Sequence, residues 1–343
     1  MVTATVAGAY LLDLAERLAL RYDSATLHAI AERASGGQLD ARRPDGQRAS
    51  ALTVSGTPLE VSVSGGRGSS TPAIRYVTET ATQETDFATR VAAQLAAIRD
   101  LVRWLPNGDE TVADMFHTFV TTLYPEPAKV PAAHRSPTWI GVVHHSAAPN
   151  HAARIKVYGG PAIVPGGLQR LSAVWPEFAG LAPVPDREQL ITPVGAAIQV
   201  DAKGDVSYKI YSRAAYNDAA VPMKLVRYFG EPAWEMMSEL VRCGVDATDI
   251  PQHDVFVCCA RGPGEEEPAV GLTLASRKNP DLTALARELA ERHHGTTTTV
   301  DALARAAESS GASWRYSAVG LGFSADHGID KLNVYGTPDW SST

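Results

Sequence analysis

Arg154-Ile-Lys156-Val-Tyr158 alternates cationic and phenolic residues with aliphatic ones, a pattern typical of a strand with two different faces. The alternation recurs in Ser207-Tyr-Lys209-Ile-Tyr211-Ser-Arg213, and a related spacing occurs in Lys331-Leu-Asn-Val-Tyr335. Side chains two residues apart in a strand point to the same side of a sheet, so each segment carries a cation and a phenol on one face. An aliphatic side chain between them points to the other face.

Three of the seven lysines in the 343-residue chain fall in these segments. A core face excludes such charges, and a surface strand would scatter them. Several strands with the same cation and phenol face therefore predict a shared polar interior. The simplest ligand for such an interior is an anion, for example a diphosphate.

The composition limits the other partners. A net charge of −7 and an isoelectric point near 5.8 argue against nucleic acid or an anionic membrane, so the anion site should be a local basic pocket. Asp13 and Glu16 interrupt the apolar N-terminal run, which favours an amphipathic helix over a membrane span. Three cysteines are too few for a disulfide framework, which favours a reducing cytoplasm. Arginine outnumbers lysine 24 to 7, as in many GC-rich bacteria.

Strand-like pairs alternate with helical segments along the chain. Strand pairs are expected near 51–64 and 73–79, 138–145 and 153–158, 195–201 and 205–212, 253–260 and 268–275, and 313–323 and 329–335. Helices are expected at 7–22, 25–35, 86–105, 111–123, 165–175, 221–229, 232–243, 281–293 and 299–310. Ser24 is the expected N-cap of the second helix.

Hairpins joined by helices form an antiparallel sheet, because parallel neighbours need a crossover between single strands. Ten strands in one sheet would curl or close. The predicted fold is therefore α+β, a ten-stranded antiparallel β-barrel built from about five strand–strand–helix repeats, with the helices outside. We expect a single domain over residues 1–343, with a helical lead-in at 1–48 and the barrel repeats at 50–338.

The first repeat adds a motif to this pattern. It reads Pro58-Leu-Glu60-Val-Ser62 and continues with Arg75-Tyr-Val-Thr-Glu79. Together with the Lys156 and Lys209 strands, these segments make the chain resemble the ABBA, or prenyltransferase-barrel, family, and specifically its dimethylallyltryptophan synthase branch. The resemblance covers roughly residues 50–338 and rests on the order of the motifs on successive hairpins.

The resemblance implies metal-independent transfer of a dimethylallyl group from its diphosphate to an indole such as tryptophan, in secondary metabolism. By matched position, Glu60 would take the indole N–H. A second base must remove the ring proton, and the chemistry of a histidine suits that task, so His144 or His145 is expected to accept it. The diphosphate and the allyl cation would be held by Arg75, Arg154, Lys156, Tyr158, Lys209, Tyr211, Arg213, Lys331 and Tyr335. The implied partners are an aromatic acceptor and an isoprenyl diphosphate, with no resident cofactor or metal, no nucleic acid and no membrane.

The chain departs from that branch at three places. Ser207 stands where an arginine is common, Val270-Gly-Leu-Thr273 lacks the usual tyrosine, and Val143-His144-His145 replaces a lysine that commonly accepts the proton. Two alternatives stay open: an enzyme of the same fold that prenylates a phenol or a peptide side chain, and a non-catalytic barrel that binds a small molecule. The sequence has no Asp-Asp-x-x-Asp pair, which argues against a magnesium-dependent isoprenyl synthase.

Overall fold

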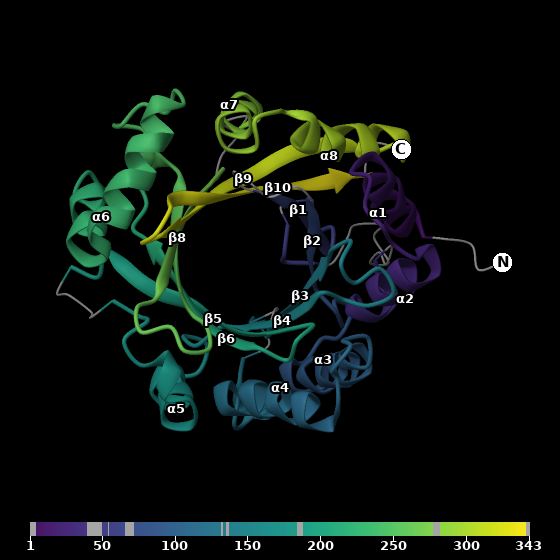
Figure 1. Cartoon of the computed structure of the whole chain (residues 1–343). Coiled ribbons are helices and arrows are strands. Elements are labelled where there is room, and N and C mark those ends of the chain that lie inside the picture. The colour runs from purple at the N-terminus through teal and green to yellow at the C-terminus, as the bar shows by residue number, and fades with distance from the viewer. Residues whose placement is uncertain are drawn as a thin grey trace.

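Ten antiparallel strands close into a barrel in the computed structural model, which describes residues 5–39, 50–53, 55–65, 72–131, 133–134, 137–183, 188–276 and 282–340 (Figure 1). The strands are β1 (Leu59–Gly65), β2 (Ala73–Thr78), β3 (Thr138–His144), β4 (Arg154–Gly159), β5 (Ile191–Asp201), β6 (Val206–Ala214), β7 (Asp254–Arg261), β8 (Ala269–Ala275), β9 (Ser313–Ser324) and β10 (Gly328–Asp339). Sequential strands pair throughout, and β10 pairs with β1 to close the ring. The predicted barrel of five hairpins is confirmed.

Helices surround the barrel on its outside, as predicted (Figure 1). They are α1 (Val6–Arg17), α2 (Ser24–Ala34), α3 (Phe87–Val102), α4 (Glu110–Leu123), α5 (Gly167–Val174), α6 (Val221–Arg242), α7 (Thr283–His294) and α8 (Thr298–Ser309). The first helix packs against the last, and Arg17 of α1 donates a hydrogen bond of 2.7 Å to Ser309 of α8. None of the helices in the described ranges combines the length and apolar character that crossing a bilayer requires.

The main core lies between the barrel wall and the helices. In β1, Leu59, Val61 and Val63 point outward and are fully buried, while Glu60 and Ser62 point into the lumen. Burial of one such aliphatic side chain contributes roughly 1.5–3 kcal/mol to stability. The outer face of each strand therefore holds the fold together, and the inner face is available for other roles.

Two helix boundaries follow local chemistry. Asp23, rather than the expected Ser24, caps α2, because its carboxylate accepts the backbone N–H of Thr26 at 2.7 Å. The segments expected at 221–229 and 232–243 are both helical, as predicted; they share the label α6, and non-helical backbone at Gly230 separates them. Gly230 has φ 63° and ψ −144°, a conformation that glycine adopts without steric cost.

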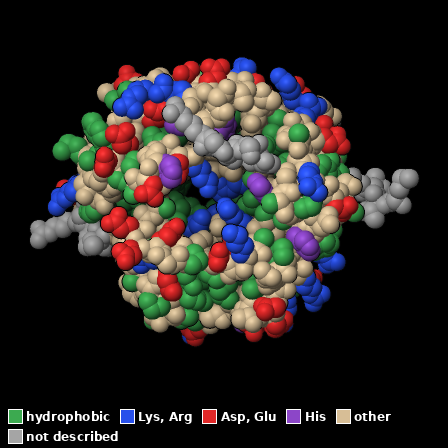
Figure 2. Space-filling view, viewed as in Figure 1, with side chains coloured by type: hydrophobic (Ala, Val, Ile, Leu, Met, Phe, Trp, Pro, Cys, Tyr) green, Lys and Arg blue, Asp and Glu red, His purple; other side chains and the backbone are tan. Residues whose placement is uncertain are grey.

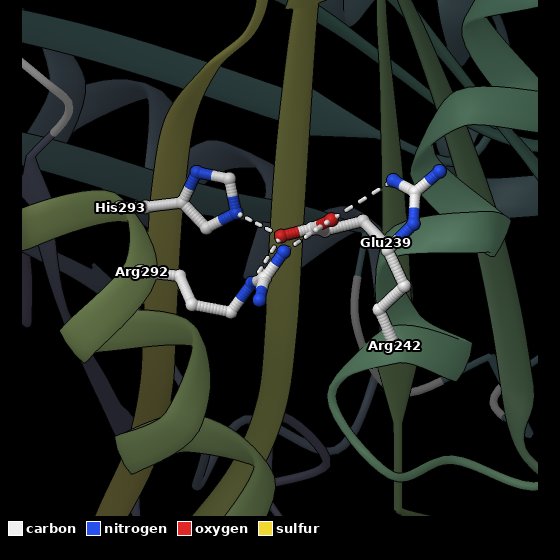
Figure 3. A network of polar contacts seen from close by, with 4 residues as sticks. All are labelled: Glu239, Arg242, Arg292 and His293. Atoms are coloured by element: carbon white, nitrogen blue, oxygen red, sulfur yellow. Dashed lines mark hydrogen bonds and ion pairs between the residues drawn. The ribbon is translucent and has the colours of Figure 1, made fainter.

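One buried carboxylate joins two of the outer helices. Glu239 of α6 accepts hydrogen bonds from Arg292 at 2.7 Å and His293 at 3.0 Å, both at the end of α7, and pairs with Arg242 at 3.3 Å (Figure 3). Burial alone would raise the pKa of Glu239, but hydrogen bonds from the two arginines outweigh it and hold the pKa below its usual value. This network fixes α6 against α7 outside the lumen.

Candidate active site

Lysine and arginine side chains gather in the hollow at the centre of the barrel (Figure 2). They lie towards the end where the two strands of each hairpin turn. Arg75 of β2 and Arg154 of β4 both pair with Val143 of the strand between them, so three adjacent strands bring the two guanidinium groups to one level. Lys156, Lys209 and Lys331 complete the group. In addition to burial, the charge of Lys209 lowers the pKa values of both Lys156 and Lys331.

Lys156 lies deepest in this group, with 6% of its surface exposed. Its ammonium donates to the hydroxyl of Tyr158 at 3.1 Å and to that of Tyr211 at 3.4 Å. The same ammonium lies 4.9 Å from the centre of the Tyr158 ring, within cation–π range. The rings of Tyr158 and Tyr211 lie 5.7 Å apart, so β4 and β6 jointly present a cation and two π-faces.

Neutral amides orient two of the other cations. Arg75 donates to Asn333 Oδ1 at 2.5 Å, and Lys209 donates to Gln199 Oε1 at 3.2 Å. An amide fixes the direction of a cation without cancelling its charge. Throughout the described ranges, no carboxylate forms an ion pair with Arg75, Lys156, Lys209 or Lys331.

Burial and the neighbouring cations disfavour the charged form of these lysines. Burial, followed by the charges of Lys209 and Arg75, lowers the pKa of Lys156 well below its usual value. Desolvation in the lumen and the charge of Arg75 lower the pKa of Lys331 to about 7, although the side chain as a whole is exposed at the mouth of the lumen. A multivalent anion bound among these groups would relieve the repulsion and restore their charge.

A cavity of about 520 Å³ opens from this group to the hairpin end of the barrel. Arg75, Arg154, Lys331 and His145 line it, together with Asp201, Lys203 and Asp330. The cavity is large enough for a diphosphate, and cations enclose it on several strands. We name this cavity with Lys156 and Lys209 the basic pocket.

The two neighbouring histidines face opposite ways, as strand geometry requires. His144 lies outside the lumen, 5% exposed, with its Nε2 3.1 Å from the hydroxyl of Tyr76 and its pKa lowered to about 4 by burial. Because its side chain faces away from the lumen, His144 cannot contact a ligand there or accept a proton from it. His145 lines the basic pocket, and its Nδ1 accepts the backbone N–H of Ala147 at 3.1 Å.

Glu60 lies towards the other end of the lumen, where the helices connect the hairpins. Its Oε1 accepts a hydrogen bond of 3.1 Å from Ser317 of β9. Burial raises the pKa of Glu60 to about 7, and the Ser317 hydrogen bond limits that rise. Tyr335 and Arg75 both pair with Ser62, two residues after Glu60 on β1. Burial raises the pKa of Tyr335, the charge of Arg75 lowers it and that of Glu60 raises it, so Tyr335 is near both the basic pocket and the carboxylate.

Arg213 is separated from the lysines. Its guanidinium forms an ion pair of 2.6 Å with Asp254 and lies 6.0 Å from the Phe256 ring centre. It lines a mostly apolar cavity of about 440 Å³ at the helix-connected end, with Trp139, Val194 and other residues of β3 to β7. Tyr158 and Tyr211 line this cavity too, so Arg213 lies on the tyrosine side of the site with its charge paired to Asp254. The structure therefore brings together, around the lumen, Arg75, Arg154, Lys156, Tyr158, Lys209, Tyr211, Lys331 and Tyr335, and Arg213 adjoins the two tyrosines but not the lysines.

Solved structures with this architecture are known. The chain has a TM-score of 0.73 and 18% identity with 5-dimethylallyltryptophan synthase from Streptomyces coelicolor, over 97% of each chain. The fold is the prenyltransferase barrel. A 6-dimethylallyltryptophan synthase from Micromonospora olivasterospora (TM-score 0.67, 16% identity, 97% and 96% of the two chains) and AnaPT from Neosartorya fischeri (0.68, 14%, 96% and 91%) share this barrel. No family model and no curated protein matches the chain.

Several residues of this prenyltransferase barrel escaped the sequence patterns. Ser317, Arg315 and Trp139 reach the lumen or its ends, yet none belongs to a Lys-x-Tyr segment. A β-bulge interrupts the alternation of β9, because Tyr335 pairs with Ala318 whereas Gly336 pairs with Tyr316. Ser317 is the extra residue, and strict alternation assigns no face to it. Gln199 and Asn333 also reach the lumen, and they do follow the alternation of their strands: Asn333 lies two residues from both Lys331 and Tyr335, and Gln199 pairs with Lys156.

Proposed function

We propose that the protein is an aromatic prenyltransferase that moves a dimethylallyl group from its diphosphate to an indole such as tryptophan, without a metal ion. The observation that carries the proposal is the basic pocket, in which Lys156, Arg75 and Lys209 have tyrosine or amide partners and no ion-paired carboxylate among the described residues. Solved structures of this fold include complexes with diphosphate and with a dimethylallyl diphosphate analogue and tryptophan.

The basic pocket supports departure of the leaving group. The C1–O bond of the allyl diphosphate breaks, and its electron pair stays on the diphosphate oxygen. Lys156, Lys209, Lys331 and Arg75 would neutralise that charge, and the contact with the buried Lys156 would be stronger than the same contact in water. In the described ranges, no group of three or more His, Cys, Asp or Glu side chains is placed to hold a metal ion. The protein's own cations would supply the positive charge.

The tyrosines support survival of the allyl cation. The Tyr158 and Tyr211 rings line the lumen next to the Lys156 ammonium. A π-face stabilises a cation and, unlike water, does not add to it. Tyr335 would cover the side nearer to Glu60.

Glu60 supports an acceptor that carries an N–H group. Its carboxylate would accept the indole N–H, orient the ring and increase its electron density. The ring carbon then bonds to C1, and the ring proton must leave. His145 is poorly suited to take it, because its Nδ1 already accepts a backbone N–H and a neutral ring then carries its proton on Nε2. We therefore propose His145 as a hydrogen-bond donor to the diphosphate, and a diphosphate oxygen as acceptor of the ring proton.

The test is a mass-spectrometric assay of the purified protein with dimethylallyl diphosphate, a panel of tryptophan, simple indoles and phenols, and EDTA. We expect a singly dimethylallylated indole and release of diphosphate in EDTA. A product formed only with phenols would show that the acceptor is a phenol and not an indole. Lack of product with every acceptor, and with geranyl diphosphate as donor, would overturn the enzyme in favour of a binding barrel. Strict dependence on an added divalent metal would contradict the metal-independent chemistry.

A further inference from the structure

Two buried glycines face the lumen beside two of its tyrosines. Gly141 of β3 and Gly320 of β9 lie on the inward face of their strands, because the aliphatic residues on either side of each are buried against the helices. The ring of a tyrosine on the next strand borders the space that a side chain would fill, Tyr158 at Gly141 and Tyr335 at Gly320. The lumen wall is therefore recessed at two places, and a ring lies in each recess.

The recess at Gly141 is the tighter one. A Cβ there would lie 3.1 Å from Cε2 and 3.6 Å from the hydroxyl oxygen of Tyr158. The first distance is shorter than the optimum of about 3.5–4.0 Å between carbon atoms. Gly141 pairs with Lys156, whereas Tyr158 pairs with Trp139. The ring thus leans diagonally over Gly141 towards Lys156, whose ammonium donates to the Tyr158 hydroxyl at 3.1 Å.

The last hairpin repeats this arrangement in the same register. Gly320 pairs with Asn333, two residues before Tyr335, and a Cβ at Gly320 would lie 3.4 Å from Cε2 of Tyr335. Arg75 donates to Asn333 at 2.5 Å. Burial raises the pKa of Tyr335, and the charge of Arg75 and its hydrogen bond to Tyr335 oppose that rise. Both rings therefore lean over a glycine towards a cation of the basic pocket.

Tyr211, the third tyrosine of the site, has no such recess. It follows Lys209, whose partner on β5 is Ala197 rather than a glycine. The glycine beside Tyr211 is its direct partner Gly195, where a Cβ would lie 3.4 Å from Cβ and 3.5 Å from Cδ2 of the tyrosine, an ordinary packing distance. A methyl group at Gly195 should be accommodated, whereas one at Gly141 must displace the ring.

We infer that Gly141 and Gly320 are positioning residues for prenyl transfer, because a side chain at either position would push a tyrosine ring off its cation and into the space of the allyl group. This inference rests on the proposed function and adds two residues that act through Tyr158 and Tyr335. Neither glycine needs to contact a substrate. Each recess keeps one ring both in contact with the diphosphate cations and clear of the reacting carbon.

The experiment is a double-mutant cycle of Gly141→Ala and Tyr158→Ala, with Gly195→Ala as the matched control. The readouts are kcat, KM for dimethylallyl diphosphate, the ratio of dimethylallyl alcohol to prenylated tryptophan, and the calorimetric affinity for inorganic diphosphate. Gly141→Ala should displace the ring by a few tenths of an ångström, lower kcat on the order of tenfold and raise the alcohol ratio several-fold. In Tyr158→Ala, which has no ring to displace, the same change should have an effect below about twofold. Gly195→Ala should stay within about twofold of wild type.

The cycle tells a positioning role from a structural one. An equal loss from Gly141→Ala with and without the Tyr158 ring would overturn the inference, since the glycine would then act through the backbone. An equal loss in Gly195→Ala would overturn it as well, and so would wild-type kcat and product ratio in Gly141→Ala. A wild type that neither binds diphosphate nor prenylates any acceptor would instead count against the proposed function.

Gly320 gives a second cycle, which decides the matter if Gly141→Ala does not fold. Gly320→Ala is combined with Tyr335→Ala, and the same readouts apply. Thr273 Oγ1 lies 3.0 Å from the position of a Cβ at Gly320, so part of the effect of Gly320→Ala will come from Thr273. Only the part that disappears in Tyr335→Ala belongs to the ring. If no part of the loss disappears there, the inference is overturned.

Discussion

The Ser317 hydroxyl donates a hydrogen bond of 3.1 Å to Oε1 of Glu60. Ser317 is the extra residue of the β9 bulge, and Glu60 lies at the start of β1. Tyr335 and Gly336 are consecutive on β10, but their partners on β9, Ala318 and Tyr316, have Ser317 between them. This extra residue makes the bulge, and the bulge brings Ser317 to the lumen. The carboxylate is thereby fixed in direction and keeps its second oxygen for a ligand. The bond also opposes the effect of burial on the Glu60 pKa.

Activity with an indole should rise as pH increases through about 7. Burial raises the pKa of Glu60 to about 7, so below that pH the carboxyl group is protonated and is a poorer acceptor for the indole N–H. Glu60→Gln should remove this limb of the pH profile and lower kcat/KM at pH 8 on the order of a hundred-fold. Ser317→Ala should move the limb to higher pH, because the lost hydrogen bond favoured the charged form.

The control for that shift is Ser317→Thr, which keeps the hydroxyl and should keep the wild-type limb. The measurement is kcat/KM for tryptophan between pH 5.5 and 9 in all four proteins. A limb that stays in place in Ser317→Ala would show that the hydrogen bond does not tune Glu60.

Affinity for inorganic diphosphate should fall as pH rises above about 7. In the free protein, burial and the charge of Arg75 lower the pKa of Lys331 to about 7, so above that pH binding must take up a proton. A bound anion favours the charged form, and the affinity should fall by up to about tenfold per pH unit in this range. Diphosphate titrates as well, so the informative quantity is the difference between wild type and Lys331→Met in calorimetry. Identical pH slopes in the two proteins would contradict the assignment.

Lys156→Met should weaken diphosphate binding and prenyl transfer together. The ammonium lies at the centre of the basic pocket with two tyrosine hydroxyls as partners, so the anion would lose a buried charge-assisted hydrogen bond. We expect kcat/KM to fall on the order of a hundred-fold or more. Lys129→Met is the matched control, because Lys129 is 75% exposed outside the barrel. Equal activity of the two variants would show that Lys156 does not bind the diphosphate.

Tyr158 should act through both its ring and its hydroxyl, and two substitutions separate them. Tyr158→Phe keeps the π-face and loses the 3.1 Å contact with Lys156, so turnover should fall on the order of tenfold. Tyr158→Leu also loses the π-face, and the allyl cation should then be captured by water more often. The ratio of dimethylallyl alcohol to prenylated indole, measured by mass spectrometry, should rise in Tyr158→Leu and stay near the wild-type value in Tyr158→Phe. The same ratio in both variants would argue against a role of the ring as a shield.

Alternation along single strands made much of the site predictable. Lys156 and Tyr158, or Lys209 and Tyr211, share a face for geometric reasons that do not depend on the rest of the chain. The five hairpins and the intervening helices were likewise visible in local periodicity, with most boundaries within a few residues of those observed. The exceptions are β1, which begins at Leu59 rather than near residue 51, and α1, which ends at Arg17 rather than at residue 22.

What could not be predicted depends on neighbours in space. Arg213 shares the face of Tyr211, but its counter-ion Asp254 comes from β7, a pairing that no local pattern contains. The inward turn of Ser317 needs a bulge, whose position is set by the partner strand. Alternation alone required the two adjacent histidines to face opposite ways, and only the full register shows that His145 is the inward one.

The division of labour between the two faces of each strand has a consequence for how this protein can change. In β4, Ile155 and Val157 are fully buried against the helices, whereas Lys156 and Tyr158 face a hollow. A substitution on the second face alters which molecules fit and react while leaving the hydrophobic layer intact. New acceptors should therefore be reachable by single inward substitutions from this sequence. Descendants of one such barrel could differ widely in product while unfolding at similar temperatures.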